Sequence, residues 1–373
     1  MGRREIAAWL TQKWKLTGDI HLALQDANGN NAGTVSVEIP VGPALDSRVG
    51  VQFGRQRQKR KTEFSENANC LQNWLAENTI RKGKALLRTL WRRACLNMLT
   101  AEQLRHYSEY GFVKAENILP DDFLIELRSR VDEYALKRRR LPQEMQLTPQ
   151  YRHWRVFGKT ISIRIPLVSP YTLRKIASLQ HDDLFRALMF NSRVLDPVEQ
   201  ILGPDIKLQR IDAFYKAPRF GWAIGVHQDA VYWPLAPIDT PDSICNVFCF
   251  LDDATENNGC LGFLPRRHRE GPLPAQWVDA DTKGERHVLP AIYSDAEKVW
   301  VPCKAGDAVF FHGMTPHFSG RNRSSKFRRA ISISCLSAKL RHTRFTRDIH
   351  GHDGPGGERE YIQLRGRSFP ECI

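Results

Sequence analysis

The chain has 373 residues, of which 42% are hydrophobic and 26% are charged, and its formal net charge at pH 7 is +14. This composition is typical of a globular protein, and the length suits one large domain or two ordinary ones. The apolar stretches are too short to cross a bilayer, so we expect no membrane-spanning segment. Neither a secretory signal nor a lipidation pattern is evident, which predicts a cytoplasmic protein.

Positive charge is concentrated in residues 51–100, which hold 11 Lys and Arg against 3 Asp and Glu. Part of the excess is a basic run at 55–61. Such runs can bind phosphate groups, but most are simply solvated. No zinc-finger spacing and no aromatic RNA-binding motif accompany the run, so we expect no nucleic-acid partner. We interpret residues 1–96 as a basic N-terminal extension.

The eight cysteines contain no Cys-x-x-Cys pair, which argues against a structural zinc site. Cys245 and Cys249 lie in an apolar run at 244–251 and are expected to be reduced core residues.

The first hundred residues carry weak structural signals. They predict a short helix over 6–16, a turn at 28–32, a strand over 34–39 and a basic helix over 71–97. From Thr100 the signals are stronger, because Thr100 and Gln103 have the spacing of a capping box and Gly111 is suited to end the helix. A second helix is expected after Pro120, with apolar residues on one face at Leu124, Leu127, Val131 and Tyr134.

Strand signals dominate the second half of the chain. After a strand at 161–165 and a helix at 181–189, short β-branched or aromatic segments lie between Gly, Pro and Asn turns. These segments are 207–216, 244–252, 259–265, 298–301, 308–312 and 329–337. Strands and helices do not alternate in the βαβ manner, so the pattern predicts an α+β protein with a mainly antiparallel β core and flanking helices.

A pair of residues near the middle of the chain has metal-ligand spacing. His227 and Asp229 are two residues apart, and on a strand or its rim they would point the same way. With a distant histidine they would form a facial triad that leaves positions open on a ferrous ion. His317, 90 residues downstream, is the candidate. The similar pair His181 and Asp183, in the run His181-Asp182-Asp183, falls in a predicted helix, where side chains two residues apart diverge, so it is interpreted as a surface or capping element.

Two neighbours compete with the proposed site residues. His312 ends an apolar strand, so a core or supporting role is expected for it rather than metal ligation. Arg328 follows His317 by 11 residues and could pair with a dicarboxylate co-substrate, because its guanidinium is permanently charged and binds carboxylates in a bidentate manner. Arg329 would face the opposite side of the same strand.

Several short motifs follow one another along the chain. They are Leu99-Thr100-Ala101-Glu102-Gln103, Tyr110-Gly111-Phe112-Val113, Phe214-Tyr215-Lys216-Ala217-Pro218, His227-Gln228-Asp229, Asn257-Asn258-Gly259-Cys260-Leu261, Leu264-Pro265, His268, Gly306-Asp307, His317-Phe318-Ser319-Gly320 and Arg328-Arg329-Ala330-Ile331-Ser332. In this order they resemble the phytanoyl-CoA dioxygenase (PhyH-like) family of iron(II)- and 2-oxoglutarate-dependent oxygenases. The resemblance covers about two thirds of the chain.

The resemblance implies a double-stranded β-helix (jelly roll) domain over 97–345, followed by a C-terminal tail at 346–373. It implies iron(II) as cofactor, with 2-oxoglutarate and O2 as co-substrates. The residues that match the family's site are the iron ligands His227, Asp229 and His317, the co-substrate arginine Arg328, the hydroxyl donor Ser319, and Gln209 and Phe248 beside the co-substrate. Lys175 is a further candidate contact, which we leave unassigned.

The implied reaction is hydroxylation, or a related oxidation, of an unactivated C–H bond in a small organic substrate such as an acyl-CoA or a secondary metabolite. Asp229 is retained as a carboxylate, which disfavours halogenation. The alternative is a non-catalytic protein of the same fold that binds through its basic N-terminal segment. All three ligands and the arginine are present, which favours the enzyme. The oligomeric state is left open.

Several other residues remain ambiguous from the sequence. The aromatic residues Trp222, Tyr232 and Trp233 flank the metal motif and are expected either to line the substrate pocket or to pack. His350 and His352 lie in a Gly- and Arg-rich segment and are interpreted as loop residues.

Overall fold

The computed structural model describes residues 98–150, 169–233, 235–277, 286–341, 361–369 and 372–373 with their side chains. Elsewhere it describes the backbone of β1 (Ile20–Gln25), β2 (Asn31–Val37), β3 (Val51–Phe53), β6 (Tyr151–Val156), β7 (Lys159–Arg164) and His342. The chain divides into two compact units, residues 1–83 and 84–373. No helix within the described part is long and apolar enough to cross a membrane.

The first unit contains a three-stranded antiparallel sheet of order β1-β2-β3. The predicted strand over 34–39 overlaps β2, whereas β1 and β3 were not predicted. The predicted helices over 6–16 and 71–97 and the basic run at 55–61 lie outside the described residues.

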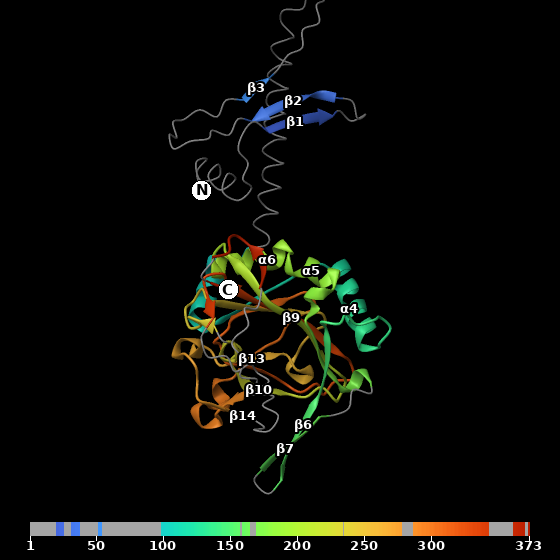
Figure 1. Cartoon of the computed structure of the whole chain (residues 1–373), viewed down its shortest axis with the longest axis vertical. Coiled ribbons are helices and arrows are strands. Elements are labelled where there is room, and N and C mark those ends of the chain that lie inside the picture. The colour runs from blue at the N-terminus through green and yellow to red at the C-terminus, as the bar shows by residue number, and fades with distance from the viewer. Residues whose placement is uncertain are drawn as a thin grey trace, which may run out of the picture. The chain divides into compact units, whose positions relative to one another are not determined.

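The second unit is built around an eight-stranded sheet (Figure 1). Its strands pair in the order β4-β17-β12-β19-β9-β8-β5, and β21 pairs with β9 as well. All of these pairings are antiparallel. Their bounds are β4 Phe112–Ala115, β5 Gln146–Pro149, β8 Leu173–Ala177, β9 Ile206–Lys216, β12 Ile244–Phe250, β17 Ala308–His312, β19 Arg328–Ser337 and β21 Ile362–Arg365.

A smaller antiparallel sheet has the order β10-β18-β13-β16. Its strands are β10 Ile224–His227, β13 Leu261–Phe263, β16 Val299–Val301 and β18 His317–Ser319. Aromatic side chains from both sheets pack together, and the rings of Phe112 and Phe263 stack with their centroids 4.3 Å apart. Two facing antiparallel sheets with this core form the expected double-stranded β-helix.

The remaining short strands form three antiparallel pairs. These are β6 with β7, β11 (Leu235–Ala236) with β20 (Arg341–His342), and β14 (Ala275–Trp277) with β15 (Arg286–Val288). The strand predicted over 161–165 falls on β7.

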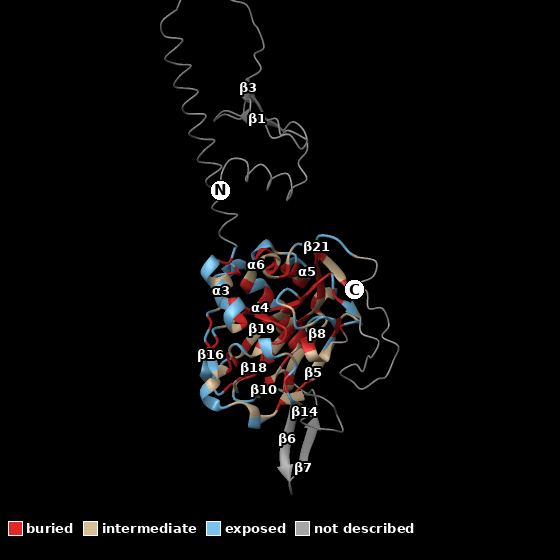
Figure 2. Ribbon diagram, turned by 90° about the vertical axis from the view of Figure 1, so that its left-hand side faces the viewer, coloured by how far each residue is buried: buried red, intermediate tan, exposed pale blue. Residues whose placement is uncertain are grey.

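Helices cover the outer face of the large sheet, and buried residues concentrate where the two meet (Figure 2). They are α3 (Ala101–Tyr110), α4 (Asp121–Ala135), α5 (Asp183–Met189) and α6 (Ser192–Leu202). The predicted capping box at Thr100 is present, with Gly111 in the left-handed conformation at the end of α3. Leu127 and Val131 of α4 are fully buried, as their spacing predicts.

Several features differ from the sequence expectations. The helix expected over 181–189 is interrupted at Asp182, whose side chain caps α5 by accepting from the backbone N–H of Leu184. The helix α6 and the strand β8 were not predicted. Within the segment expected to be a tail, β21 adds a strand to the large sheet, and Arg365 pairs with Asp196 of α6 at 2.6 Å.

Candidate metal and co-substrate site

The two halves of the predicted triad meet at one end of the small sheet. His227 is the last residue of β10 and lies opposite His317 of β18 in the strand register. Asp229 follows in helical backbone conformation, so a turn rather than strand alternation brings its carboxylate to the histidines. The intervening Gln228 is buried, donates to the carbonyls of Gly271 and Met314, and accepts from Leu273, which fixes the turn.

The three side chains present their ligand atoms to one point. One ligand atom from each of His227, Asp229 and His317 lies within 4.8 Å of the other two. The Nδ1 of His227 lies 2.8 Å from the carbonyl of Gly225, and that of His317 lies 3.0 Å from the carbonyl of Thr315. With Nδ1–H donating to these carbonyls, the Nε2 of each histidine is the nitrogen that can coordinate a metal.

The charge states at this point suit a divalent metal. Burial lowers the pKa of His317 to about 4, so its imidazole is neutral at pH 7. Burial would raise the pKa of the Asp229 carboxyl, but the attraction of His317, His227 and Arg210 outweighs it and holds that pKa below its usual range. A neutral imidazole and an ionised carboxylate are the forms that bind metal.

Asn246 supports the carboxylate from β12. Its side-chain Nδ2 donates to Oδ2 of Asp229 at 2.9 Å, and the residue is fully buried. The sequence analysis missed this residue, although a lone amide in the apolar run of β12 is a signal that could have found it. A hydrogen bond of this kind fixes a ligand's orientation.

A second group of polar atoms inside the fold lacks partners. Arg328 is 1% exposed, and its Nε and Nη1 have no hydrogen-bond acceptor among the described residues. The same holds for the buried Oγ of Ser319, which lies two residues from His317 on β18. Burial lowers the pKa of Arg328 to about 10, so it remains charged at pH 7. A buried cation and a buried hydroxyl that both lack partners among the described residues are the polar groups that an anion could satisfy.

Phe248 and Gln209 also reach this interior. The guanidinium carbon of Arg328 lies 5.9 Å from the ring centroid of Phe248, on the neighbouring strand β12. Gln209 is the extra residue of a bulge in β9, between the residues that pair with Ser334 and Cys335. Its Oε1 is buried and has no partner among the described side chains or backbone groups.

The competing residues are engaged elsewhere. Arg329 faces the helices and pairs with Asp252 at 2.8 Å and with Asp132 of α4 at 2.6 Å. The Nε2 of His312 lies 2.8 Å from the carbonyl of Thr240, and its Nδ1 accepts from the backbone of Met314. His312 is not part of the metal-competent cluster.

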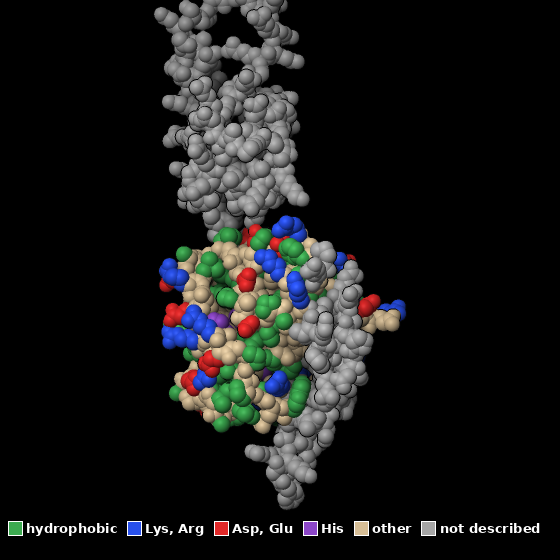
Figure 3. Space-filling view, turned by 60° about the vertical axis from the view of Figure 1, so that its left-hand side comes forward, with side chains coloured by type: hydrophobic (Ala, Val, Ile, Leu, Met, Phe, Trp, Pro, Cys, Tyr) green, Lys and Arg blue, Asp and Glu red, His purple; other side chains and the backbone are tan. Residues whose placement is uncertain are grey.

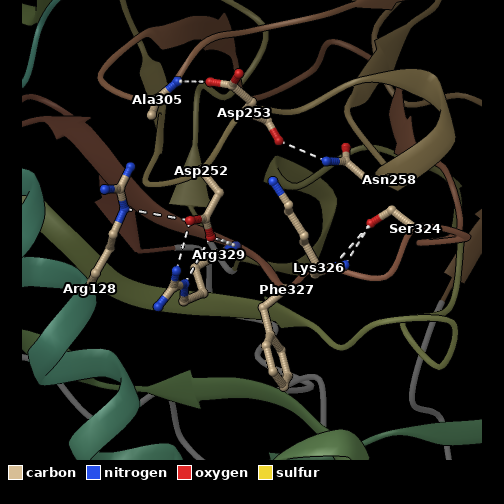
Figure 4. A pocket seen from close by; sticks show the side chains of 9 residues that line it. All are labelled: Arg128, Asp252, Asp253, Asn258, Ala305, Ser324, Lys326, Phe327 and Arg329. Atoms are coloured by element: carbon tan, nitrogen blue, oxygen red, sulfur yellow. Dashed lines mark hydrogen bonds and ion pairs between the residues drawn. The ribbon is translucent and has the colours of Figure 1, made fainter.

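A pocket on the outside of the large sheet is distinct from the triad (Figure 4). Asp252 lies there between the guanidinium groups of Arg128 and Arg329, and Lys326 and Phe327 complete one wall. Its acids and bases largely satisfy one another, so it has the character of a surface ion-pair network.

The aromatic residues around the metal motif have separate contacts. The hydroxyl of Tyr232 accepts from the backbone N–H of Arg286 at 2.7 Å. The guanidinium carbon of Arg321 lies over Trp222, 4.4 Å from the centroid of the ring. Trp233 packs on a separate apolar cluster. His350 and His352 lie outside the described residues.

A buried ion-pair cluster that the sequence analysis did not identify lies on the inner face of β8 and β9. Lys175 and Arg210 each approach Oδ2 of Asp212 at 3.1 Å. Burial lowers the pKa of Lys175 to about 8. The partners on β8 and β9 are far apart in sequence, so only the folded register reveals the cluster.

Comparison with known proteins identifies a family profile and several relatives that match this chain. The family profile for phytanoyl-CoA dioxygenase (PhyH) matches residues 107–330, more than half of the chain. The human protein "Phytanoyl-CoA dioxygenase, peroxisomal" is 28% identical over 280 residues, covering 73% of this chain and 78% of that protein. The Caenorhabditis elegans "Probable phytanoyl-CoA dioxygenase" is 27% identical over 246 residues, covering 63% and 75%.

Solved structures support the fold. The apo form of the non-heme monooxygenase ThoJ has a TM-score of 0.52 and 19% identity, covering 72% of this chain and 85% of that one. EvdO2 from Micromonospora carbonacea var. aurantiaca has a TM-score of 0.51 and 19% identity, covering 69% and 98%. With the matching family profile, these findings confirm the predicted family and fold. The chain belongs to the phytanoyl-CoA dioxygenase (PhyH) family of iron(II)- and 2-oxoglutarate-dependent oxygenases.

Proposed function

We propose that this protein oxidises an unactivated C–H bond of a small organic substrate, by hydroxylation or a related oxidation. In that reaction one oxygen atom of O2 enters the substrate and the other enters succinate, as 2-oxoglutarate loses CO2. The observation that carries the proposal is the coexistence of the His227, Asp229 and His317 cluster with a buried, unpaired Arg328 in the same interior.

We assign His227, Asp229 and His317 as the protein ligands of iron(II). Two imidazoles and one carboxylate are the donor set of non-heme iron(II) oxygenases, and the metal supplies the activation of dioxygen. The fit rests on the convergence of one ligand atom from each residue and on the ionised carboxylate that Asn246 holds in place.

We assign Arg328 and Ser319 to the distal carboxylate of 2-oxoglutarate. A carboxylate bound there would satisfy the two unpartnered guanidinium nitrogens and the Ser319 hydroxyl together. Phe248 would form an apolar wall beside the co-substrate, and Gln209 would contribute a polar contact. Lys216, buried opposite Arg328 in the strand register, adds a second positive charge at this end of the interior.

The substrate class and location are also proposals. The human relative is named for an acyl-CoA and for the peroxisome, whereas the solved carbocyclase SnoK is described as coming from nogalamycin biosynthesis. An acyl-CoA or a secondary metabolite, oxidised in the cytoplasm, remains the expectation for this chain. We further propose that residues 97–345 form the catalytic domain and that residues 1–96 are an accessory extension.

The test is a 2-oxoglutarate turnover assay with iron(II), screened against a metabolite library by mass spectrometry. Iron-dependent succinate formation, stimulated by a metabolite that gains one oxygen, is the expected result. Failure to form succinate with iron(II) and O2 present would count against an enzymatic role.

A further inference from the structure

The inner face of the large sheet carries a row of polar residues that leads from the triad to Arg210. Asn246, which holds Asp229, lies opposite Ser334 of β19, and Ser334 lies opposite Arg210 of β9. Adjacent strands are about 4.8 Å apart, so this row spans roughly 10 Å.

Asp212 pairs with Nε of the Arg210 guanidinium but does not contact its two terminal nitrogens. Its Oδ1 accepts from the backbone of Ser178, and its Oδ2 accepts from Lys175 and lies 3.1 Å from Nε of Arg210. The two terminal nitrogens of Arg210 have no acceptor among the described residues. The Arg210 side chain is 35% exposed against 3% for Asp212, so its free end faces open space.

The cluster also carries an excess of positive charge. Lys175 and Arg210 face a single carboxylate, Asp212, inside the fold. The outer surface provides a contrast, since Figure 3 shows basic and acidic side chains interspersed on the face it displays. An inward-facing cation with two free donors is suited to binding an oxyanion.

Arg210 and Arg328 are anchored at different levels of the inner face of the large sheet. The two arginines mark positions six residues apart along β19, because Arg328 itself and Ser334, the partner of Arg210, are both on that strand. This separation corresponds to about 20 Å of extended chain. The guanidinium groups contact opposite neighbours of β19, since Arg328 lies against Phe248 of β12 and Arg210 lies against Asp212 of β9.

We propose that Arg210, oriented by Asp212, binds the primary substrate through an oxyanion, either a carboxylate or a phosphate, located near the carbon that is oxidised. This assignment rests on the proposed function, because it places the substrate beside the triad. It narrows the substrate classes proposed above, because free acids and phosphate esters are favoured over an acyl-CoA that is oxidised beside its neutral thioester.

Binding without turnover tests the proposal. The full chain is incubated without oxygen in Mn²⁺ and saturating 2-oxoglutarate, with an equimolar mixture of straight-chain carboxylic acids, alkyl phosphates and the methyl esters of those acids. Rapid gel filtration followed by mass spectrometry then measures which compounds are retained. Saturating 2-oxoglutarate keeps the acids from binding at Arg328.

The wild-type protein should retain one anionic class at least tenfold over the methyl esters of equal length, and the retained class identifies the oxyanion. Arg210→Gln should abolish this preference, and Arg210→Lys should keep part of it, because an ammonium preserves the charge but not the fork. Arg186→Gln, which alters an exposed arginine on α5, is the matched control and should keep the full preference.

Three results would overturn the proposal. They are a wild-type protein that retains no anion above the esters, an Arg210→Gln variant that keeps the preference, and a folded variant that loses only 2-oxoglutarate affinity. Arg210→Lys provides a second test if Arg210→Gln does not fold. Because retention is measured without turnover, absence of succinate formation would refute the proposed function separately.

Discussion

Arg328 and Arg329 are consecutive residues of β19 whose side chains serve opposite faces of one sheet. Arg328 points between the two sheets, is 1% exposed and keeps two nitrogens without acceptors among the described residues. Arg329 points to the helices and is paired with Asp252 and Asp132. The strand alternation therefore separates a candidate ligand-binding cation from a structural one.

Substitution of Arg328 should weaken co-substrate binding. Arg328→Ala removes a buried cation that lies against Phe248 and has two nitrogens without acceptors among the described residues, so the KM for 2-oxoglutarate should rise at least roughly tenfold, for a loss of about 1.5–3 kcal/mol. Arg328→Lys should recover only part of the affinity. Steady-state kinetics at varied 2-oxoglutarate measure the effect, and iron binding should persist.

Arg329→Ala is the control for this pair. It should leave the affinity for 2-oxoglutarate nearly unchanged but lower the free energy of unfolding by about 1–3 kcal/mol, because Asp252 and Asp132 lose their partner. If Arg329→Ala abolished co-substrate binding while Arg328→Ala did not, the inward-facing register of β19 would be wrong.

Asn246→Ala should loosen the metal ligand that it contacts. Loss of the 2.9 Å hydrogen bond to Asp229 is expected to weaken metal binding by about 10- to 100-fold, the range for residues that orient ligands. Titration with iron(II) under anaerobic conditions measures the affinity. Asn258→Ala, which alters an amide in a turn away from the triad, should bind iron like the wild type. Equal affinities for both variants would refute the supporting role of Asn246.

Buried histidines should make the fold sensitive to acid. Burial lowers the pKa of His268 to about 4 from 6.5, so between these values the unfolded chain binds a proton that the folded chain does not. The free energy of unfolding should therefore fall as the pH is lowered through this window, by about 1.4 kcal/mol per pH unit for this residue.

Chemical denaturation at several pH values measures this slope. His268→Gln should reduce the slope between pH 6 and 4.5 by about 1 kcal/mol per pH unit. His181→Gln, which alters an exposed histidine, is the matched control and should leave the slope unchanged. An unchanged slope in His268→Gln would show that His268 protonates equally in both states.

Local patterns predicted much of this fold. The apolar run of β12 and the β-branched and aromatic residues of β9 and β19 identified core strands, and the spacing on α4 identified its buried face. The helix α6 was missed because Pro197 lies inside it, and proline ordinarily interrupts a helix. The strand β8 was missed because two charged residues, Arg174 and Lys175, lie at its centre. Lys175 can face the interior there because it donates to Asp212 on β9.

The site also contains residues that the sequence could predict and residues that it could not. The spacing of His227 and Asp229, together with the order of the family motifs, was enough to identify the triad and Arg328 as candidates. The roles of Asn246 and Arg210 depend on cross-strand register through Ser334, and no local pattern encodes it.

Metal stoichiometry tests the central claim most directly. Iron(II) added anaerobically to the wild-type chain should bind one ion per chain, and His227→Ala should lose most of this binding. His181→Ala, which alters the other His-x-Asp pair, should bind iron like the wild type, because the metal-competent cluster among the described residues is His227, Asp229 and His317. Tight one-to-one binding by His227→Ala, or its loss in His181→Ala, would contradict the assigned site.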